Sequence, residues 1–312
     1  MAPARAWRFE FLRSPVGPGE WASCSPPRSA VSRGDPHSHV SYPLTAIISD
    51  LHGNVPALTV LLEDAHERGA RRYVCLGDVV GYGAKPRECL DVVMERCVQN
   101  PIDGLEPGLC LQGNHEEALL GSAEDFNPKA RAAIEWTRDA IGEGDDKERI
   151  DAYWNFIGEL APSASDGVAM FAHGSPSDPV REYMLPRDIR DEVKMRRVFR
   201  DMVEGTRVCF VGHSHVPAVY YEDLRLYRPR NRRDEVEVPV EGPYDLGDMR
   251  SIINVGSVGQ PRDGDPRLSY VLFDGSNVSF VRLAYDHERA AQDIKDTNAL
   301  PEYLAERLLI GR

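Results

Sequence analysis

The sequence predicts an α/β fold, and three observations lead to that class. From Leu44 onward, short apolar runs alternate with stretches of helical periodicity, in the order LTAIIS, VPALTVLLEDAHERG, RRYVCLG, PRECLDVVMERC and GLCLQG. After Asp166 the strand-like runs return, and the last two form a hairpin, LSYVLFDGSNVSFVRLAY, around the turn DGSN. The stretch between these two groups is helical. The chain therefore begins as a βαβαβ unit and adds a second set of strands.

The first residues of the chain differ from the rest in composition. Residues 1–42 contain Pro, Ser, Gly and Arg without periodicity, and such a segment cannot offset its ordering entropy by burial. We expect a disordered tail over 1–42 and a single domain over 43–312. A transit peptide is the alternative for a start that is rich in Arg and Ser and poor in acids.

Within the domain, a helical insert is expected at about 117–165, where ARAAIEWTRDAIG and RIDAYWNFIGEL have apolar residues three and four positions apart. The polar stretch 222–250 predicts an edge hairpin or a loop. The chain is then expected to end in two helices that Pro301 separates.

Composition excludes several classes of function. Lys and Arg number 37 against 50 Asp and Glu, and a net charge of -13 disfavours broad, sequence-independent binding to nucleic acid. A small phosphorylated substrate remains compatible with this charge. The six cysteines include no CxxC pair, which suits a reducing compartment. No run reaches the roughly 18 apolar residues of a membrane span, so we expect a cytoplasmic protein without membrane contact.

Ligand-type side chains follow five of the strand-like runs. In ISDLHGN, Asp50 and His52 stand two positions apart behind an apolar run, so they share one small space at the strand end. A turn with an Asx cap and an incidental imidazole is the alternative for this motif alone. The same placement recurs at Asp78, Asn114, His115, His173, His213 and His215.

Five of the nine histidines belong to this set. In open α/β sheets, sites form beyond the carboxyl ends of the strands, so separate strand ends can deliver these side chains to one crevice. The alternative is that each is an ordinary surface or core histidine, but this does not explain why five of them follow strand ends. The sequence therefore predicts a metal site.

Spacing and order resemble the calcineurin-like metallophosphoesterase family, and in particular its bacterial-type members. The matching motifs are DxH at Asp50, GDxxG at Asp78, GNHE at 113–116, an isolated His-Gly at His173 and GHxH at 212–215. As an ordered set these motifs are highly specific. The resemblance also continues through INVGSVGQPRDGDPR to the C-terminal helices, so it covers nearly everything after the tail.

The resemblance implies a four-layer α/β/β/α sandwich of two mixed sheets flanked by helices, with two metal ions at the mouth between the sheets. It also implies the ligands, which are Asp50, His52 and His215 for one ion, Asn114, His173 and His213 for the other, and Asp78 as the bridge. His115 takes the place of the family histidine that binds no metal and instead contacts the phosphate or protonates the leaving group.

The residue types agree with this chemistry. Carboxylate and amide oxygens mixed with imidazoles suit Mn²⁺, our first expectation, and also Fe or Zn²⁺, while the lack of thiolates disfavours a structural zinc site. Two ions need a shared ligand, which a carboxylate supplies. His115 fits the work of a general acid because imidazole titrates near neutral pH, and a structural histidine is the alternative.

Two positions in the glycine-rich motifs qualify the resemblance. Gly81 stands where one subclass has a tyrosine ligand for ferric ion, so we do not expect the purple-acid type. Arg262 in the segment NVGSVGQPRDGDPR is the basic residue best placed to bind a phosphate, with a solvent-facing turn arginine as the alternative.

Three hypotheses for function follow. The first is hydrolysis of phosphomonoesters or phosphodiesters of small molecules by a dinuclear metal site. The second keeps the chemistry but acts on phosphoproteins or nucleic acid, and the acidic charge disfavours nucleic acid. The third is a non-catalytic scaffold with the same fold, which would be expected to lose a ligand or His115, whereas this sequence has the full set.

Overall fold

The computed structural model describes residues 42–98, 105–124, 126–229 and 240–312. The expected tail over 1–42 lies outside these residues except for Tyr42, whose ring packs edge-on against Phe273 at 5.1 Å between centroids. No helix in the described ranges is long and apolar enough to cross a membrane.

Two six-stranded sheets form the centre of the fold. The first has the order β3-β2-β1-β11-β12-β9 and the second β4-β5-β6-β10-β7-β8. The first sheet comprises β1 (Thr45–Ile48), β2 (Arg72–Cys75), β3 (Leu109–Cys110), β11 (Leu268–Phe273), β12 (Asn277–Leu283) and β9 (Val240–Asp245). The second comprises β4 (Ser163–Ser165), β5 (Ala169–Ala172), β6 (Val208–Val211), β10 (Ser251–Asn254), β7 (Ala218–Tyr221) and β8 (Leu226–Tyr227).

Both sheets are mixed, and each has a parallel half. In the first sheet β1, β2 and β3 run parallel, while β11, β12 and β9 pair antiparallel. In the second sheet β5, β6 and β10 run parallel, with antiparallel β4, β7 and β8 beside them. The carboxyl ends of three parallel strands therefore meet at one edge of each sheet.

Strand side chains alternate between two cores. In β1, Ile47 packs between the sheets, and Ala46 and Ile48 pack under the helices. In β6, Phe210 faces the other sheet, whereas Cys209 faces outward to a third cluster. Full burial of a large apolar side chain such as Ile47 or Phe210 contributes about 1.5–3 kcal/mol to the stability of the fold.

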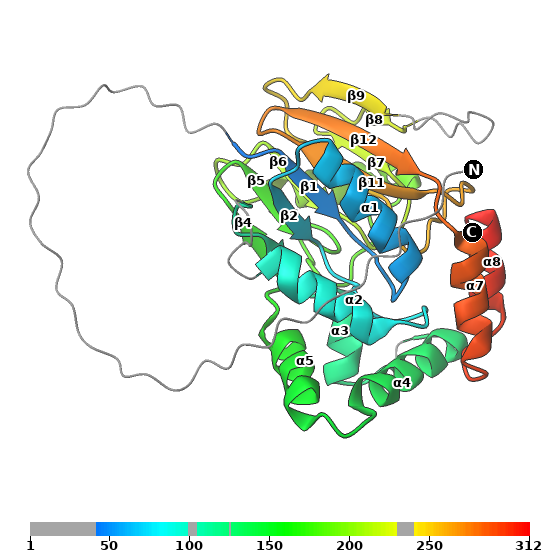
Figure 1. Cartoon of the computed structure of the whole chain (residues 1–312). Helices are drawn as coiled ribbons and strands as arrows, with labels where there is room; N and C mark the ends of the chain where they lie inside the picture. The colour runs from blue at the N-terminus through cyan, green and yellow to red at the C-terminus, as the bar shows by residue number, and fades with distance from the viewer. Residues whose placement is uncertain (1–41, 99–104, 125, 230–239) are drawn as a thin grey trace, which may run out of the picture. The chain divides into compact units, whose positions relative to one another are not determined.

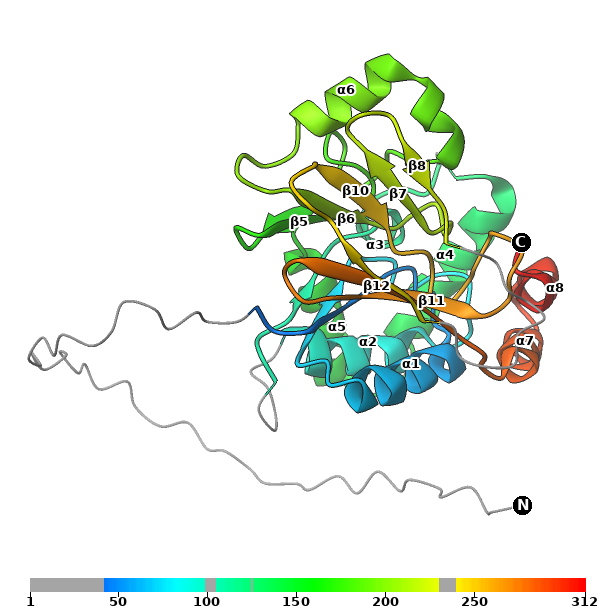
Figure 2. The ribbon, with the colours of Figure 1, turned by 90° about the horizontal axis from the view of Figure 1, so that it is seen from above.

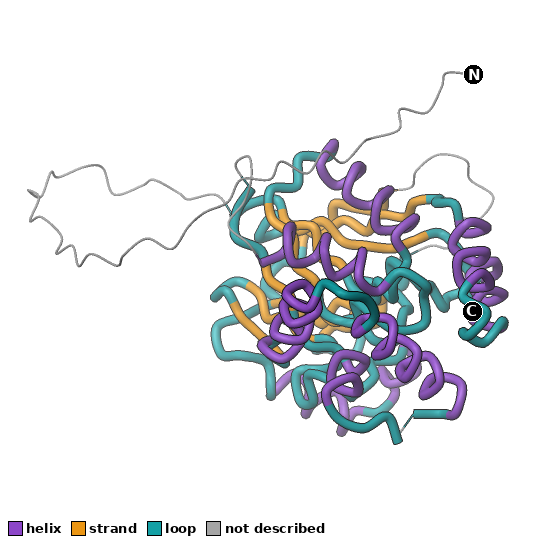
Figure 3. Tube along the Cα trace, turned by 60° about the horizontal axis from the view of Figure 1, so that its bottom comes forward, coloured by secondary structure: helices purple, strands orange, loops and turns teal. Residues whose placement is uncertain are grey.

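Helices cover the outer face of each sheet, as Figures 1 and 2 show. Those beside the first sheet are α1 (Val55–Glu67), α2 (Pro86–Val93), α4 (Pro128–Gly142), α5 (Lys147–Glu159), α7 (His287–Asp296) and α8 (Tyr303–Ile310). On the second sheet, α6 (Glu192–Arg200) covers the outer face. In Figure 3, α3 (Asn114–Leu120), α4 and α5 come forward. The expected four-layer α/β/β/α sandwich is therefore confirmed.

The polar stretch 222–250 is more than the expected edge hairpin or loop. Its first part forms β8, which pairs with β7 at the edge of the second sheet. Its last part forms β9, which pairs with β12 at the edge of the first sheet. The stretch thus contributes one short strand to each sheet. Each strand forms its backbone hydrogen bonds with the edge of a different sheet.

Candidate metal centre

The parallel strands bring the sequence-predicted residues together. Asp50 and His52 follow β1, Asp78 follows β2, and Asn114 and His115 begin α3 directly beyond β3. From the second sheet, His173 follows β5, while His213 and His215 follow β6. Both parallel halves therefore contribute side chains to one buried group.

The first group of potential ligand atoms comes from Asp50, His52, Asp78 and His215, which lie within 4.8 Å of one another. His215 Nε2 is 3.0 Å from Asp50 Oδ1 and 3.3 Å from His52 Nε2. His52 Nε2 is 3.7 Å from Asp78 Oδ2. All four side chains are buried.

The second group contains Asp78, His173 and His213, again within 4.8 Å. His173 Nε2 is 3.3 Å from Asp78 Oδ2 and 3.1 Å from His213 Nδ1. Asn114 joins this group, because its Oδ1 lies 3.1 Å from the same nitrogen of His173. Asp78 is common to both groups.

Backbone carbonyls orient three of the histidines. His52 Nδ1 lies 3.0 Å from the Val80 carbonyl and His215 Nδ1 lies 2.5 Å from the Gln260 carbonyl. His213 Nε2 lies 3.1 Å from the Arg181 carbonyl. A carbonyl can only accept, so these nitrogens carry the protons and the opposite nitrogens face the group as bare lone pairs.

This donor set fits a pair of cations. The facing Nε2 atoms of His52 and His215 and the Oδ1 atom of Asp50 are all acceptors, and their mutual repulsion in a buried space needs a positive charge. Burial lowers the pKa of His173, but the carboxylates of Asp78, Asp50 and Glu116 together outweigh burial and raise that pKa to about 9. Asp78 thus already favours a positive charge where a second ion would bind.

Left-handed backbone is concentrated at these turns. In the described ranges eight residues other than glycine have positive φ, and six of them belong to the site: Asp50, His52, Asp78, Tyr82, His213 and His215. Such conformations cost on the order of 1–3 kcal/mol each, and they persist where the surroundings determine them, as at binding sites. These backbone conformations are therefore part of what brings the ligand-type side chains together.

Comparison with known proteins agrees with this geometry. Residues 44–277 match the model of the calcineurin-like phosphoesterase superfamily domain. The chain belongs to this superfamily. An uncharacterized protein of Methanocaldococcus jannaschii is 35% identical over 277 residues, which are 86% of this chain and 98% of the relative.

The solved structures that resemble this phosphoesterase domain include the following two. A metallophosphoesterase from Sphaerobacter thermophilus has 34% identity and a TM-score of 0.68, covering 87% of this chain and 100% of that one. A hypothetical protein from Pyrococcus horikoshii OT3 has a TM-score of 0.63, covering 86% of this chain and 98% of that one. Its identity is 19%, so it supports the fold alone.

Glu116 is a residue of the candidate site to which the sequence reasoning gave no role. Its carboxylate accepts the main-chain N–H groups of Asp78 at 2.8 Å, Gly113 at 2.9 Å and Val80 at 3.2 Å. Burial and the charge of Asp78 raise the pKa of Glu116 to about 7. The GNHE motif contained the residue, but only the folded chain brings it under the Asp78 turn.

His115 lies beside the metal-ligand group. Its Nε2 is 4.0 Å from Asp78 Oδ2, and its ring contacts Tyr82 and Phe126 at centroid distances of 4.4 and 5.4 Å. Its Nδ1 is buried without a hydrogen-bond partner in the described ranges. Burial lowers the pKa of His115 to about 4, and the positive charge of Arg262 acts in the same direction.

Arg262 lies at the edge of the same site. Its main-chain N–H donates to the His215 carbonyl at 3.2 Å, and its side chain donates to Gln260 Oε1 at 2.7 Å. Its guanidinium carbon is 5.7 Å from the Tyr82 ring centre. Tyr183 stacks on His213 with centroids 3.7 Å apart and remains 43% exposed.

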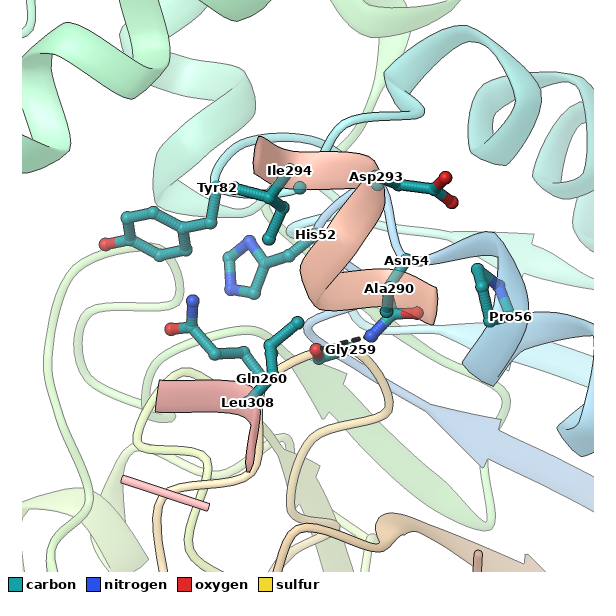
Figure 4. Close-up of a pocket in the computed structure, with 12 residues that line it drawn as sticks. His52, Asn54, Pro56, Tyr82, Gly259, Gln260, Ala290, Asp293, Ile294 and Leu308 are labelled. Carbon is teal, nitrogen blue, oxygen red and sulfur yellow. Dashed lines mark hydrogen bonds between the residues drawn. The ribbon is translucent and has the colours of Figure 1, made fainter. Parts of the chain in front are cut away.

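A small cavity separates the site from the C-terminal helices. Figure 4 shows the side chains that line it, which include His52, Tyr82 and Gln260 from the loops, Ile294 of α7 and Leu308 of α8. Its volume of about 10 Å³ is enough for roughly one water molecule. The cavity is therefore a small gap between His52 and the residues packed around it, and it is too small to admit a substrate.

Proposed function

We propose that the chain is a dinuclear-metal-dependent hydrolase of phosphate esters that acts on a small molecule, either as a phosphomonoesterase or as a phosphodiesterase. The observation that carries this proposal is the shared carboxylate of Asp78, which belongs to two groups of convergent ligand atoms. Membership of the calcineurin-like superfamily supports the same reaction class.

Asp50, His52 and His215 would hold one ion, and Asn114, His173 and His213 the other, with Asp78 between them. We propose Mn²⁺ as the metal, and Fe or Zn²⁺ as alternatives that the same oxygen and imidazole ligands accept. When bound, two such ions activate a water for attack on phosphorus and neutralise the charge of the phosphate.

The neighbouring residues supply the remaining functions. His115 would donate a proton to the leaving oxygen, because the negative charge of a bound phosphate opposes the effects that lower its pKa in the free protein. Arg262 would bind a phosphate oxygen, since its main-chain N–H contacts His215 and its guanidinium lies over the Tyr82 ring, which packs against His115.

Phosphoprotein hydrolysis and a non-catalytic scaffold remain the alternatives. The charge of -13 supports a small substrate over nucleic acid. The complete ligand set with His115 beside it favours an enzyme over a scaffold. We also propose a cytoplasmic location, supported by the five described cysteines, all of which are buried as free thiols.

Elemental analysis of wild type and Asp78→Ala tests the shared carboxylate. Wild type should bind two ions per chain, and a folded Asp78→Ala protein should bind neither firmly. A screen of monoesters and of cyclic and linear diesters with Mn²⁺, Zn²⁺ or Mg²⁺ then tests the reaction. Wild-type occupancy in Asp78→Ala would contradict the bridge, and failure to hydrolyse any ester would contradict the enzyme.

A further inference from the structure

Three cationic side chains from separate segments surround two tyrosine rings near Arg262. The guanidinium carbon of Arg262 lies 5.7 Å from the Tyr82 ring centre, and that of Arg307 on α8 lies 5.7 Å from the Tyr303 ring centre. Lys129 at the start of α4 places its Nζ 4.3 Å from the same Tyr303 ring. In a chain with a net charge of -13, this is a local concentration of positive charge.

Main-chain contacts hold α8 against the loop that carries Arg262. The Gly264 N–H donates to the Gly311 carbonyl at 2.8 Å, directly beyond the end of α8. Leu308 of α8 lines the same small cavity as Gln260, the residue that accepts two hydrogen bonds from Arg262 (Figure 4). The position of Arg307 relative to Arg262 is therefore set by packing.

Nearby carboxylates are already engaged with other arginines. Asp263 pairs with Arg282, Asp265 pairs with Arg267 at 2.7 Å, and Asp293 pairs with Arg289 at 2.9 Å. In the described ranges, no Asp or Glu side chain forms an ion pair with Arg262, Arg307 or Lys129.

The charges of the two arginines also act on each other. Burial and the positive charge of Arg262 lower the pKa of Arg307 below its usual value. Arg307 Nε donates to the Arg312 main-chain oxygen at 2.6 Å, which fixes the guanidinium in this position. Two repelling guanidinium groups, half-buried and held in place, are stabilised by an anion between them.

We propose that Arg307 and Arg262, with Lys129 beside them, form a second anion subsite next to the metal centre, and that the substrate carries a second phosphate group in its leaving portion. This inference rests on the proposed function and names its substrate class. Arg307 lies beyond residues 44–277, which match the superfamily, so the subsite combines that domain with the C-terminal helices.

The reaction leaves the second phosphate intact. Water adds to the phosphorus at the metal centre, the bond from that phosphorus to the ester oxygen breaks, and the ester oxygen takes a proton. The products are inorganic phosphate and an alcohol that keeps its second phosphate. Arg307 contributes by binding and positions the leaving portion, because a guanidinium matches two phosphate oxygens at once.

The matched substrates are the bisphosphate and the monophosphate of ethylene glycol, assayed with Mn²⁺-loaded protein. Wild type should prefer the bisphosphate in kcat/KM by more than the statistical factor of about two that its second reactive group provides. Arg307→Gln should reduce the preference about 10- to 100-fold, which corresponds to the loss of one hydrogen-bonded charge pair. Arg196→Gln on α6, an exposed residue that pairs with Glu192, removes the same charge elsewhere and should keep the preference.

A binding measurement separates this subsite from the proposed reaction. Calorimetry with the metal-loaded protein should show that ethylene bisphosphonate binds more tightly than ethylphosphonate, and that Arg307→Gln removes the difference. Lys129→Gln should weaken the same difference in affinity. Because Lys129 is exposed, this variant can be used if Arg307→Gln does not fold. Equal binding of the two phosphonates by wild type, or an unchanged preference in both variants, would overturn the subsite. Bisphosphonate selectivity without ester hydrolysis would support the subsite and contradict the proposed function.

Discussion

Gly81 and His115 touch so closely that no larger residue fits at position 81. A Cβ on Gly81 would lie 2.1 Å from His115 Nδ1, and the backbone of Gly81 has φ +86°. The contact gives a structural reason for glycine where the purple-acid subclass has tyrosine. It also allows His115 to be displaced without changing a proposed metal ligand.

Gly81→Ala should lower turnover on an alkyl phosphate by about 10²-fold or more, because the displaced imidazole can no longer act as an acid. Metal content should stay at the wild-type value. Gly69→Ala is the matched control, since Gly69 has the same φ of +86° and a Cβ added there would meet no atom within 4 Å. Both variants carry the cost of placing alanine at positive φ, about 1–2 kcal/mol, but only Gly81→Ala should lose activity. Equal turnover in the two variants would show that the position of His115 is unimportant.

His115→Ala tests the chemistry of the same residue directly. If His115 protonates the leaving oxygen, turnover of an alkyl phosphate should fall about 10²- to 10⁴-fold. Turnover of p-nitrophenyl phosphate should fall much less, because that leaving group departs without a proton. An equal loss on both substrates would assign His115 to phosphate binding, and a lost metal ion would make it a ligand.

Glu116→Gln should weaken metal binding about 10- to 100-fold without removing a ligand. The carboxylate accepts three main-chain N–H groups, and an amide would turn an N–H donor toward one of them. The turn that carries Asp78 would then move. Competition with a chelator measures the affinity, and Glu135→Gln at an exposed position of α4 should behave as wild type.

Asp166, which is not one of the proposed metal ligands, provides a test of pH dependence. It accepts hydrogen bonds from Tyr42 and Arg72, each at 2.6 Å. Burial raises the pKa of Asp166, but these hydrogen bonds and those from the main chain outweigh burial and lower it below 3.8. The stabilisation is therefore complete above pH 3.8 and is lost as the pH falls through the lowered value.

Asp166→Asn should accordingly reduce the free energy of unfolding by about 1–3 kcal/mol at neutral pH, with the difference from wild type shrinking below pH ~4. Urea unfolding of both proteins at several pH values measures this difference in the free energy of unfolding. Asp248→Asn is the control, because Asp248 is fully exposed where it pairs with Arg207. A difference that persists at pH ~2 would show that the Asp166 contact is not electrostatic.

Local patterns predicted the parts of the fold that depend on neighbours in sequence. The hairpin around DGSN forms as β11 and β12, since the Asp274 side chain accepts the N–H groups of Ser276 and Asn277 in the turn. The strand-end residues come together because their strands are parallel, which the βαβ pattern implied.

Features that depend on docking between distant segments were missed. We did not predict α6, although Met195, Val198 and Phe199 have helical spacing, because its single apolar face is short and the rest is charged. The role of Glu116 depends on the turn between β2 and α2, which only the folded chain brings beside it. Arg307 likewise approaches Arg262 only once α8 packs on its loop.

Each proposed ion would take ligands from both sheets. Asp50 and His52 follow the first sheet, whereas His215 follows the second. An ion held by all three would act as a cross-link between two layers that also meet through apolar side chains such as Ile47 and Phe210. Because it binds the folded state alone, it would stabilise that state by RT ln(1 + [M]/Kd), about 2.7 kcal/mol at a hundred times Kd. The proposed metal centre would then also stabilise the contact between the two sheets, and the free metal concentration would change the stability of the folded protein.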